Sequence, residues 1–258
     1  MSEFSVPVVQ IASLANPLVK DLRKLSQDST AYRKLGRVWL EGDHLCRAAL
    51  AKGLTPVMAV FAESFWPLAP TTWTQVATKN IVVSDALWPE FSGLESPARM
   101  GFVMELPAAA DVAPLAATVI LDRVQDAGNV GSILRSAAAF GFGQIIALKG
   151  TAALWSPKVL RAGMGAHFAL QLVEGVDIEA LDALQVPILV TSSHHGAFVH
   201  QQKLPKPCAW AMGHVGQGVG EALMTRSSLK VRIAQPGGEE SLNVASAAAI
   251  CLYASSLP

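Results

Sequence analysis

The sequence contains few cysteines and no long apolar run. Its three cysteines, Cys46, Cys208 and Cys251, lie far apart, and none belongs to a CxxC pair. This spacing argues against a disulfide framework and against a cysteine-based zinc site, so we expect reduced thiols. No stretch reaches the roughly 18 apolar residues of a membrane span, and the first residues lack a basic region followed by an apolar run. We therefore expect a cytoplasmic protein with no membrane partner.

The chain also lacks an excess of charge of either sign. Twenty basic residues balance twenty acidic ones, so total charge indicates neither a nucleic-acid nor a membrane partner. The phosphate-binding pattern GxxxxGK[ST] is absent, which leaves nucleotide triphosphate hydrolysis without support. No internal repeat or low-complexity tract is evident. Apolar residues make up 51% of the 258 positions, which is ample for the core of a folded protein.

Positive charge is concentrated in one short segment, residues 18–37. Two acidic residues in this segment oppose six basic ones, a local excess of four: Lys20, Arg23, Lys24, Arg33, Lys34 and Arg37. A solvated helix face would explain this excess as well as a binding surface would.

The order of expected elements indicates two α/β domains. Residues 1–106 form the first, and the alanine- and proline-rich stretch 107–117 has the composition of a linker. In the second domain, residues 118–258, short apolar runs alternate with helical patterns, which predicts a parallel sheet covered by helices on both faces. We expect its strands within 118–124, 144–150, 168–175, 187–193, 208–213 and 230–234.

Three glycine-containing segments of the second domain stand where a strand should give way to a helix: 121–141, 211–223 and 232–254. Ligands bind at the carboxyl ends of parallel strands, where loops expose backbone groups, so we expect the three loops to form one site. The GQGVG turn at 216–220 is a weak match to a Rossmann-type nucleotide site. Fewer than forty residues follow it, too few for the strands that such a fold requires downstream.

Polar side chains in these segments have structural as well as functional explanations. Asp122 and Asp126 could be general bases, although loop hydrogen bonding is the simpler reading. Asn129 offers both a donor and an acceptor. We expect a helix from about Gly131, which would place Arg135 one turn inside it with a guanidinium fork suited to phosphate.

Near the last helix, Glu240, Ser241 and Asn243 could be no more than caps. His194, His195 and His200 lie in a glycine-containing loop without a carboxylate among them. We therefore expect no metal site.

Together the three segments resemble the SpoU (TrmH) family of RNA ribose 2′-O-methyltransferases. GNVGSILRSAAAFG is similar to the family's first motif, and SLNVASAAAICLY is similar to its closing motif. The stretch from Ile11 to Leu50 resembles the RNA-binding module that many members carry before the catalytic domain. The resemblance covers most of the chain.

The resemblance implies an α/β catalytic domain with a deep trefoil knot, a homodimer, and S-adenosylmethionine as cofactor. Carried over by motif position, the cofactor would lie against Gly213, Ile233 and Leu242. The methyl group and the ribose hydroxyl would be faced by Asn129, Arg135, Ser241 and Asn243. The RNA, ribosomal or else transfer RNA, would be bound by the six basic residues of segment 18–37. Tyr32 and Trp39 could stack on bases, although the alternation of Trp39 with apolar residues favours the core.

For the reaction, a ribose hydroxyl needs its proton removed or strongly hydrogen-bonded, whereas the sulfonium of the cofactor is already activated. Arg135 stays protonated at ordinary pH, so we expect it to orient an RNA phosphate and not to accept the proton. One departure stands out: the family's second motif usually reads glycine-asparagine-glutamate, but this chain has Gly213, His214 and Val215. The alternative function is therefore an RNA-binding protein with an impaired methyltransferase domain.

Overall fold

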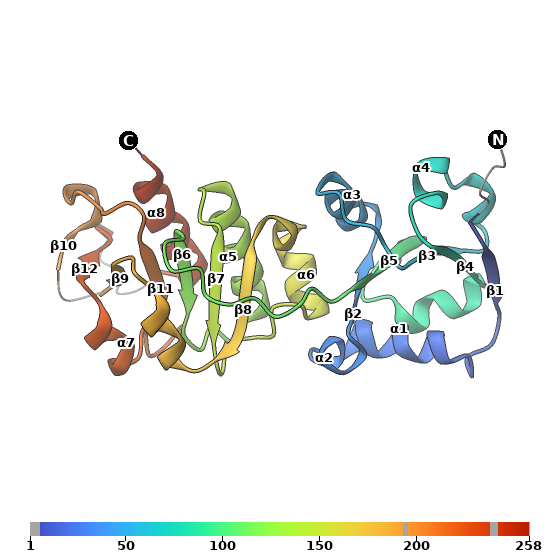
Figure 1. Ribbon diagram of the computed structural model, residues 1–258, viewed down its shortest axis with the longest axis horizontal. Helices are drawn as coiled ribbons and strands as arrows, with labels where there is room; N and C mark the ends of the chain where they lie inside the picture. Colours follow the sequence, from blue (N-terminus) through green and yellow to red (C-terminus); the bar gives the residue numbers. More distant parts are fainter. Residues whose placement is uncertain (1–5, 193–195, 238–241, 258) are drawn as a thin grey trace. The chain divides into compact units, whose positions relative to one another are not determined.

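The computed structural model describes residues 6–192, 196–237 and 242–257. Its internal contacts divide the chain into two units, whose elements are labelled in Figure 1. The first unit comprises Met1–Ala108 and Trp155–Phe168, and the second comprises Ala109–Leu154 and Ala169–Pro258. The division after Ala108 falls inside the stretch predicted as a linker. Residues 155–168 differ from the predicted boundary, because helix α6 (Pro157–Gly163) packs on α1 and β2 of the first unit.

The first unit is built on a five-stranded mixed sheet with the order β1-β4-β3-β5-β2. Its strands are β1 (Val8–Ile11), β2 (Arg37–Glu41), β3 (Met58–Ala62), β4 (Lys79–Val83) and β5 (Met100–Glu105). The pairs β1-β4 and β4-β3 are parallel, and the pairs of β5 with β3 and β2 are antiparallel. β2 to β5 are mostly buried, whereas β1 is largely exposed.

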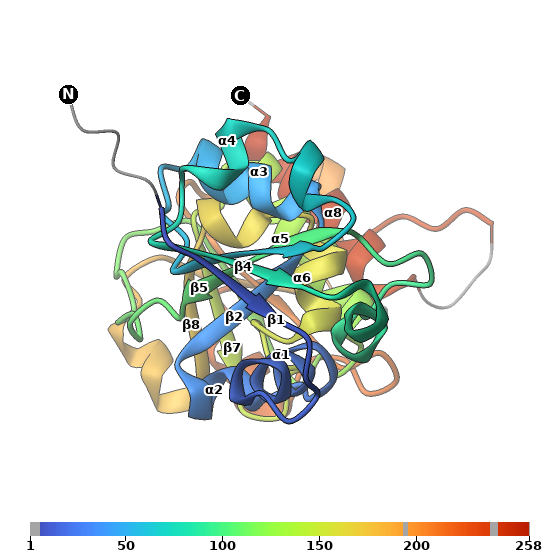
Figure 2. The same cartoon turned by 90° about the vertical axis from the view of Figure 1, so that its right-hand side faces the viewer.

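Helices cover both faces of this sheet, with α1 and α2 on one side and α3 and α4 on the other (Figure 2). The helical segments are α1 (Pro17–Gln27), α2 (Ala31–Leu35), α3 (Asp43–Ala51), η1 (Trp66–Leu68), α4 (Thr71–Thr74), η2 (Asp85–Phe91), α6, and η3 (Ala166–Ala169). The Asn16 side chain caps α1 by accepting from the Leu18 N–H at 2.9 Å, and Pro17 occupies the first turn. Burial of Val19 and Leu22 fixes the inward face of α1 and leaves its basic residues outside.

The second unit contains a seven-stranded sheet with the order β10-β12-β9-β11-β6-β7-β8, in which every pair is parallel. The strands are β6 (Thr118–Leu121), β7 (Gln144–Leu148), β8 (Gln171–Val176), β9 (Ile188–Thr191), β10 (Ala197–Phe198), β11 (Ala209–Met212) and β12 (Leu229–Arg232). The predicted parallel sheet is thus confirmed. Sequence reasoning missed β10, because two residues are too few to show a pattern.

The chain order of the strands reverses at β6. From β6 the chain runs through β7 to β8 at one edge, and it then returns to the other side of β6, where β9, β11 and β12 pair. A point at which strand order reverses leaves a crevice at the carboxyl ends of the strands, which is where α/β sheets bind ligands. The helical segments of this unit are α5 (Ala127–Ala139), η4 (Ile178–Ala183), η5 (Val199–Gln201), α7 (Glu221–Arg226) and α8 (Val244–Ser256).

The core of the second unit is apolar and includes the segment that enters the sheet. Ile120, Ile146 and Val190 are among its buried members, and Val112 from the predicted linker packs against them. Gln144 is fully buried, and its amide accepts from the Ala113 N–H at 2.7 Å and donates to Thr118 Oγ1 at 2.8 Å. The predicted linker is therefore held, over part of its length, against the start of β7 in the sheet of this unit.

Among the described residues, no helix has both the length and the apolarity to cross a membrane. The three cysteines are buried and unpaired. Burial raises the pKa of Cys46 and Cys208, and it raises the pKa of Cys251 to about 12. These thiols are therefore neutral core side chains at physiological pH.

Candidate functional site

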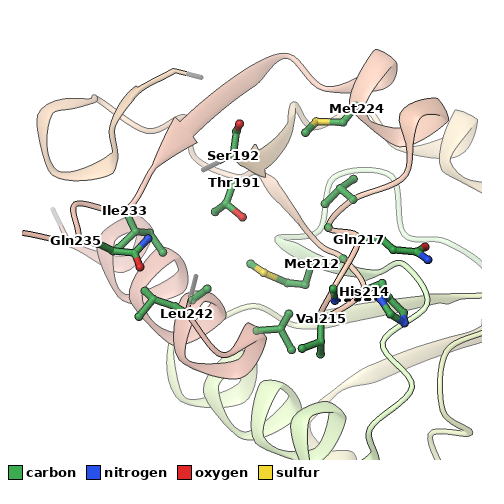
Figure 3. Close-up of a pocket in the computed structure, with 16 residues that line it drawn as sticks. Thr191, Ser192, Met212, His214, Val215, Gln217, Met224, Ile233, Gln235 and Leu242 are labelled. Atoms are coloured by element: carbon green, nitrogen blue, oxygen red, sulfur yellow. Dashed lines mark hydrogen bonds between the residues drawn. The ribbon is translucent and has the colours of Figure 1, made fainter. Parts of the chain in front are cut away.

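A cavity of about 450 Å³ opens at the carboxyl ends of β9, β11 and β12 in the second unit (Figure 3). Strand ends supply Thr191 and Met212, and the segment after β12 supplies Ile233 and Gln235. The start of α8 supplies Val244 and Ala247. Two of the three glycine-containing segments meet here, which places the cavity at the strand ends where the sequence predicted a site.

The loop from Gly213 to Gly220 forms one wall of the cavity. His214 and Gly218 exchange backbone hydrogen bonds at 3.0 and 2.8 Å, and the His214 Nδ1 accepts from the Gly216 N–H at 3.1 Å. A Cβ on Gly213 would lie 2.2 Å from the Gly218 carbonyl carbon, so no other residue fits there without movement. Gly218 has a φ of 66°, which also favours glycine. The glycines of GQGVG therefore make a tight turn in this loop and not a Rossmann phosphate turn.

The three residues predicted to touch a cofactor, Gly213, Ile233 and Leu242, all line this one cavity. Figure 3 shows Ile233 and Leu242 on one side and Val215 on the other. Leu242 is 39% exposed and Val215 is 60% exposed, so both present apolar surface toward the open space. The structure thus brings the predicted cofactor residues together with the position at which the chain departs from the family motif.

The polar side chains of the lining are those of Thr191, Ser192, His214, Gln217 and Gln235. The Gln235 Oε1 atom is buried and has no hydrogen-bond partner among the described residues. A buried acceptor without a partner is costly unless a ligand or water satisfies it. The described lining contains no carboxylate and no lysine or arginine, and His214 is its one titratable side chain. Gln235 could not be predicted from sequence, because a lone glutamine in a loop carries no pattern.

The first and third segments meet through two asparagines. The Asn243 Nδ2 donates to the Asn129 Oδ1 at 2.9 Å, although the residues are 114 positions apart. Asn243 is also the N-cap of α8, and its Oδ1 accepts from the N–H groups of Ala245 and Ser246 at 2.9 and 3.2 Å. The cap fixes which way the Asn243 amide faces, and that orientation aims its nitrogen at Asn129. Asn243 stands between Leu242 and Val244, which line the cavity.

Asn129 lies in the first turn of α5, which begins four residues earlier than expected. Asp126 is the N-cap, and its Oδ1 accepts from the Asn129 N–H at 2.7 Å. The helix therefore starts at Ala127 and not near Gly131, because the capping carboxylate satisfies a free N–H group there. Asp126 thus caps a helix, which is the structural role that the sequence favoured over a role as general base.

Arg135 is consequently more than two turns into α5 and not one. The side chain is exposed, lines no part of the cavity, and has neither an ion-pair nor a hydrogen-bond partner among the described residues. Ser241, the fourth residue predicted to face the reacting groups, lies outside the described residues, as do Glu240, His194 and His195. The structure therefore brings Asn129 and Asn243 together and leaves Arg135 apart from them.

Asp122 also has a structural role. It is 7% exposed and accepts a hydrogen bond from the Gly220 N–H at 2.7 Å, which ties the end of β6 to the end of the cavity loop. His200 stacks on Phe198, with ring centroids 5.6 Å apart. No group of three or more His, Cys, Asp or Glu side chains suited to a metal ion occurs in the described part of the chain.

The six basic residues predicted to bind RNA all lie in the first unit. Lys20, Arg23 and Lys24 are exposed on α1, and Arg33 and Lys34 are exposed on α2. Acidic side chains lie beside Arg23, which is 3.7 Å from Glu90, and beside Arg37, which is 3.4 Å from Glu105. Lys20 and Lys24 border a shallow depression on α1.

Both aromatic residues considered for base stacking are buried. Tyr32 is 2% exposed and Trp39 is 4% exposed. Trp39 packs edge to face against Trp88 and Phe91, with ring centroids 6.3 and 5.9 Å apart. Neither ring has a face available for RNA, so the stacking suggestion was wrong for Tyr32, and the core position favoured for Trp39 is confirmed.

The chain is similar to known proteins in sequence. The sequence profile of the SpoU rRNA Methylase family matches residues 116–253. The chain is 31% identical over 250 residues to the 23S rRNA (guanosine(2553)-2′-O)-methyltransferase RlmP of Bacillus subtilis, covering 95% of this chain and 98% of that protein.

Solved structures agree with this match. The AdoMet-bound rRNA methyltransferase of Sinorhizobium meliloti aligns with a TM-score of 0.82 at 26% identity, covering 96% of this chain and 97% of that chain. The SpoU methyltransferase AviRb of Streptomyces viridochromogenes, in complex with AdoMet, aligns with a TM-score of 0.80 at 26% identity, covering 93% of this chain and 97% of that chain.

Proposed function

Because the chain belongs to the SpoU rRNA Methylase family, we propose that it transfers a methyl group from S-adenosylmethionine to a ribose 2′-hydroxyl of RNA. The observation that carries the proposal is the cavity at the strand ends, since residues of two separate segments, expected from their motif positions to contact the cofactor, line it together. A structured ribosomal RNA is the favoured substrate, with transfer RNA second. The name of the Bacillus subtilis relative supports that order.

The residues of the cavity fit the proposed cofactor. The volume of about 450 Å³ lies within the range of about 300–1,000 Å³ that is usual for small-molecule sites. Met212, Ile233 and Leu242 offer apolar surface to the adenine and methionine carbons, and the partnerless Gln235 Oε1 can accept from an amino group. S-adenosylmethionine supplies a methyl group already activated on a sulfonium. The wall of glycine backbone lets a ligand approach the main chain closely.

The asparagine pair limits what the chain can do for the ribose hydroxyl. The Asn243 Oδ1 already accepts two hydrogen bonds and the Asn129 Oδ1 accepts one, so the pair offers a substrate mainly amide N–H donors. Donors orient the nucleophilic oxygen and stabilise negative charge as it develops, but they cannot take the proton. We assign Asn129 and Asn243 this orienting role, and an RNA phosphate held by Arg135 remains our proposed proton acceptor.

The proposal has further parts that rest on the family resemblance. The first unit binds RNA through the basic residues of α1, α2 and β2, and the second unit binds the cofactor. The C-terminal part of the second unit passes through a loop to form a trefoil knot, and two chains form a homodimer in the cytoplasm. The all-parallel sheet and the alignment with family structures over most of the chain support a family-like fold for the second unit.

The alternative function, an RNA-binding protein with an impaired domain, depends on Val215. The comparisons give no sign of impairment, so the missing carboxylate at this one position does not favour that alternative.

The test is incorporation of methyl from labelled S-adenosylmethionine into ribosomal and transfer RNA by the full chain. Digestion to nucleosides should then yield 2′-O-methylated ribose. Methylation of a base would refute the 2′-O assignment. Tight RNA binding without any incorporation would establish the impaired alternative.

A further inference from the structure

The bend after β6 combines a buried carboxylate with an arginine in an unfavourable backbone conformation. Asp122 is 7% exposed, and Arg123 has a φ of 58°. Among the described residues, Met164 is the one other non-glycine residue with a positive φ. The left-handed conformation costs a residue with a side chain about 1–2 kcal/mol, so it persists where other contacts hold it.

The contacts that hold this bend lead to the cavity loop. The Arg123 Nε and Nη2 donate to the two carboxylate oxygens of Asp122 at 3.0 and 3.2 Å. The same carboxylate accepts from the Gly220 N–H at 2.7 Å, across 98 positions. Asp122 raises the pKa of the Arg123 guanidinium through these hydrogen bonds and through its charge, so the group stays positive.

Arg123 reaches a second point of the same loop. Its Nη1 donates to the Gln217 Oε1 at 3.2 Å. Gln217 lines the cavity, yet its side chain points away from the open space (Figure 3). The Asp122–Arg123 clasp, meaning these two side chains with their bonds to Gln217 and Gly220, therefore holds the loop from behind at two positions. The clasp can therefore affect ligand binding through the loop without any of its atoms contacting the ligand.

We propose that Arg123 is a positioning residue for cofactor binding, which acts through Gln217 to hold the loop 213–220 in the shape that encloses the cavity. This inference rests on the proposed function, because it concerns the same cofactor site. A loop without the clasp would have to be ordered at the moment of binding, and that ordering cost weakens affinity. Because the guanidinium lies behind the loop, turnover at saturating cofactor should be little affected. The expected signature is a raised Kd and KM for S-adenosylmethionine with a nearly unchanged kcat.

The decisive variant is Arg123→Gly in the full chain. Glycine removes the guanidinium but adopts a positive φ without strain, and this relief offsets part of the stability lost with the Asp122–Arg123 ion pair, so the chain should still fold with a modest fall in melting temperature. Calorimetric titration with S-adenosylmethionine should nevertheless show about a three- to tenfold weaker affinity, the size expected for one lost charged hydrogen bond at a partly exposed site. Gln217→Ala should weaken binding similarly. The double variant Arg123→Gly with Gln217→Ala should be no weaker than either single one, because both remove the same link.

Arg226→Ala is the matched control. Arg226 lies in the same unit, pairs with Asp182, and its side chain is 34% exposed against 37% for Arg123. It makes no contact with the loop 213–220 that the structure records, so cofactor affinity should not change.

The inference is overturned if Arg123→Gly binds S-adenosylmethionine as tightly as the unmodified chain does, or if Arg226→Ala weakens binding equally. If the loss of cofactor affinity in the double variant equals the sum of the losses in the two single variants, Arg123 does not act through Gln217. Failure of the unmodified chain to bind S-adenosylmethionine at all would refute the proposed function, and this inference with it. The two failures are therefore distinguishable.

Discussion

Asn243 donates a hydrogen bond from its Nδ2 to the Oδ1 of Asn129 at 2.9 Å, and this bond joins the start of α8 to the start of α5. The two helices also pack against each other. Because the Asn243 Oδ1 is committed to capping α8, the same side chain both stabilises a helix and orients Asn129. The cap and the proposed catalytic role can therefore be separated by substitution.

Asn243→Ser should separate them. Serine is as good an N-cap as asparagine, so the free energy of unfolding should change by only a few tenths of a kcal/mol, whereas Asn243→Ala should lose about 1 kcal/mol. Both variants lack the amide donor and should lower kcat about ten- to a hundredfold. Chemical denaturation and single-turnover methyl transfer measure the two effects. A serine variant with normal transfer would show that the Asn243 nitrogen has no role in the reaction.

Gly213→Ala should damage the cavity wall. The new methyl carbon would lie 2.2 Å from the Gly218 carbonyl carbon, so the turn must open. We expect a loss of about 1–3 kcal/mol in the free energy of unfolding and a loss of cofactor binding. Gly143→Ala is the control, because a Cβ at Gly143 meets nothing within 4 Å. Calorimetry measures the stability and the cofactor affinity of both variants. Equal losses in Gly213→Ala and Gly143→Ala would contradict the argument from the close contact at Gly213.

Val215→Glu tests the departure from the family motif. Val215 is 60% exposed, and a charge there keeps its water, so the free energy of unfolding should change by less than about 0.5 kcal/mol. The rate of methyl transfer at saturating cofactor should change. An unchanged rate with an unchanged pH profile would place Val215 outside the chemistry.

The buried cysteine on α8 should make stability fall at high pH. The pKa of Cys251 is raised in the folded state from 9.0 to about 12, so between these values the folded chain binds more protons than the unfolded chain does. Stability contributed by the protonated thiol is fully present below pH 9 and is lost as pH rises toward 12. Denaturation series at pH 8, 9 and 10 should show a shallower decline for Cys251→Ala than for the unmodified chain. Identical declines would mean that Cys251 does not titrate differently on folding.

Exposed lysines of α1 should contribute to RNA affinity through phosphate contacts. Lys20→Ala with Lys24→Ala should weaken binding and lower the slope of log affinity against log salt by about one for each lost contact. Lys52→Ala, another exposed lysine of the same unit, is the control. Salt titrations by fluorescence anisotropy measure the slopes. If the slope for the double variant equals the slope for Lys52→Ala, the RNA does not bind at these lysines of α1.

Much of the second unit could be predicted from sequence because its signals are local. Buried parallel strands read as short apolar runs, and every strand of the sheet except β10 overlapped such a run, with β8 and β12 each extending one residue beyond it. Glycine-containing strand-to-helix loops then located the cavity, since parallel strands bring their carboxyl ends to one edge. Gly213, Ile233 and Leu242 came from motif position and not from any local pattern.

Apart from the start of α5, the features that were missed depend on tertiary contacts. The start of α5 was misjudged although the signal was present, because Asp126 is a good N-cap three residues before Asn129. Nothing in residues 155–168 indicates that they pack with the first unit. The burial of Tyr32 and the unpaired Gln235 Oε1 likewise depend on neighbours distant in sequence.

The measurement that tests the account most directly is a map of 2′-O-methylated nucleotides in ribosomal and transfer RNA from cells with and without this protein. We predict that one or a few ribosomal positions lose the modification when the protein is absent. The unmodified chain should restore them, and Asn129→Ala should not, although it still binds S-adenosylmethionine. Identical maps in both cells, or full restoration by Asn129→Ala, would contradict the proposal that the Asn129–Asn243 pair beside this cavity directs methyl transfer to RNA.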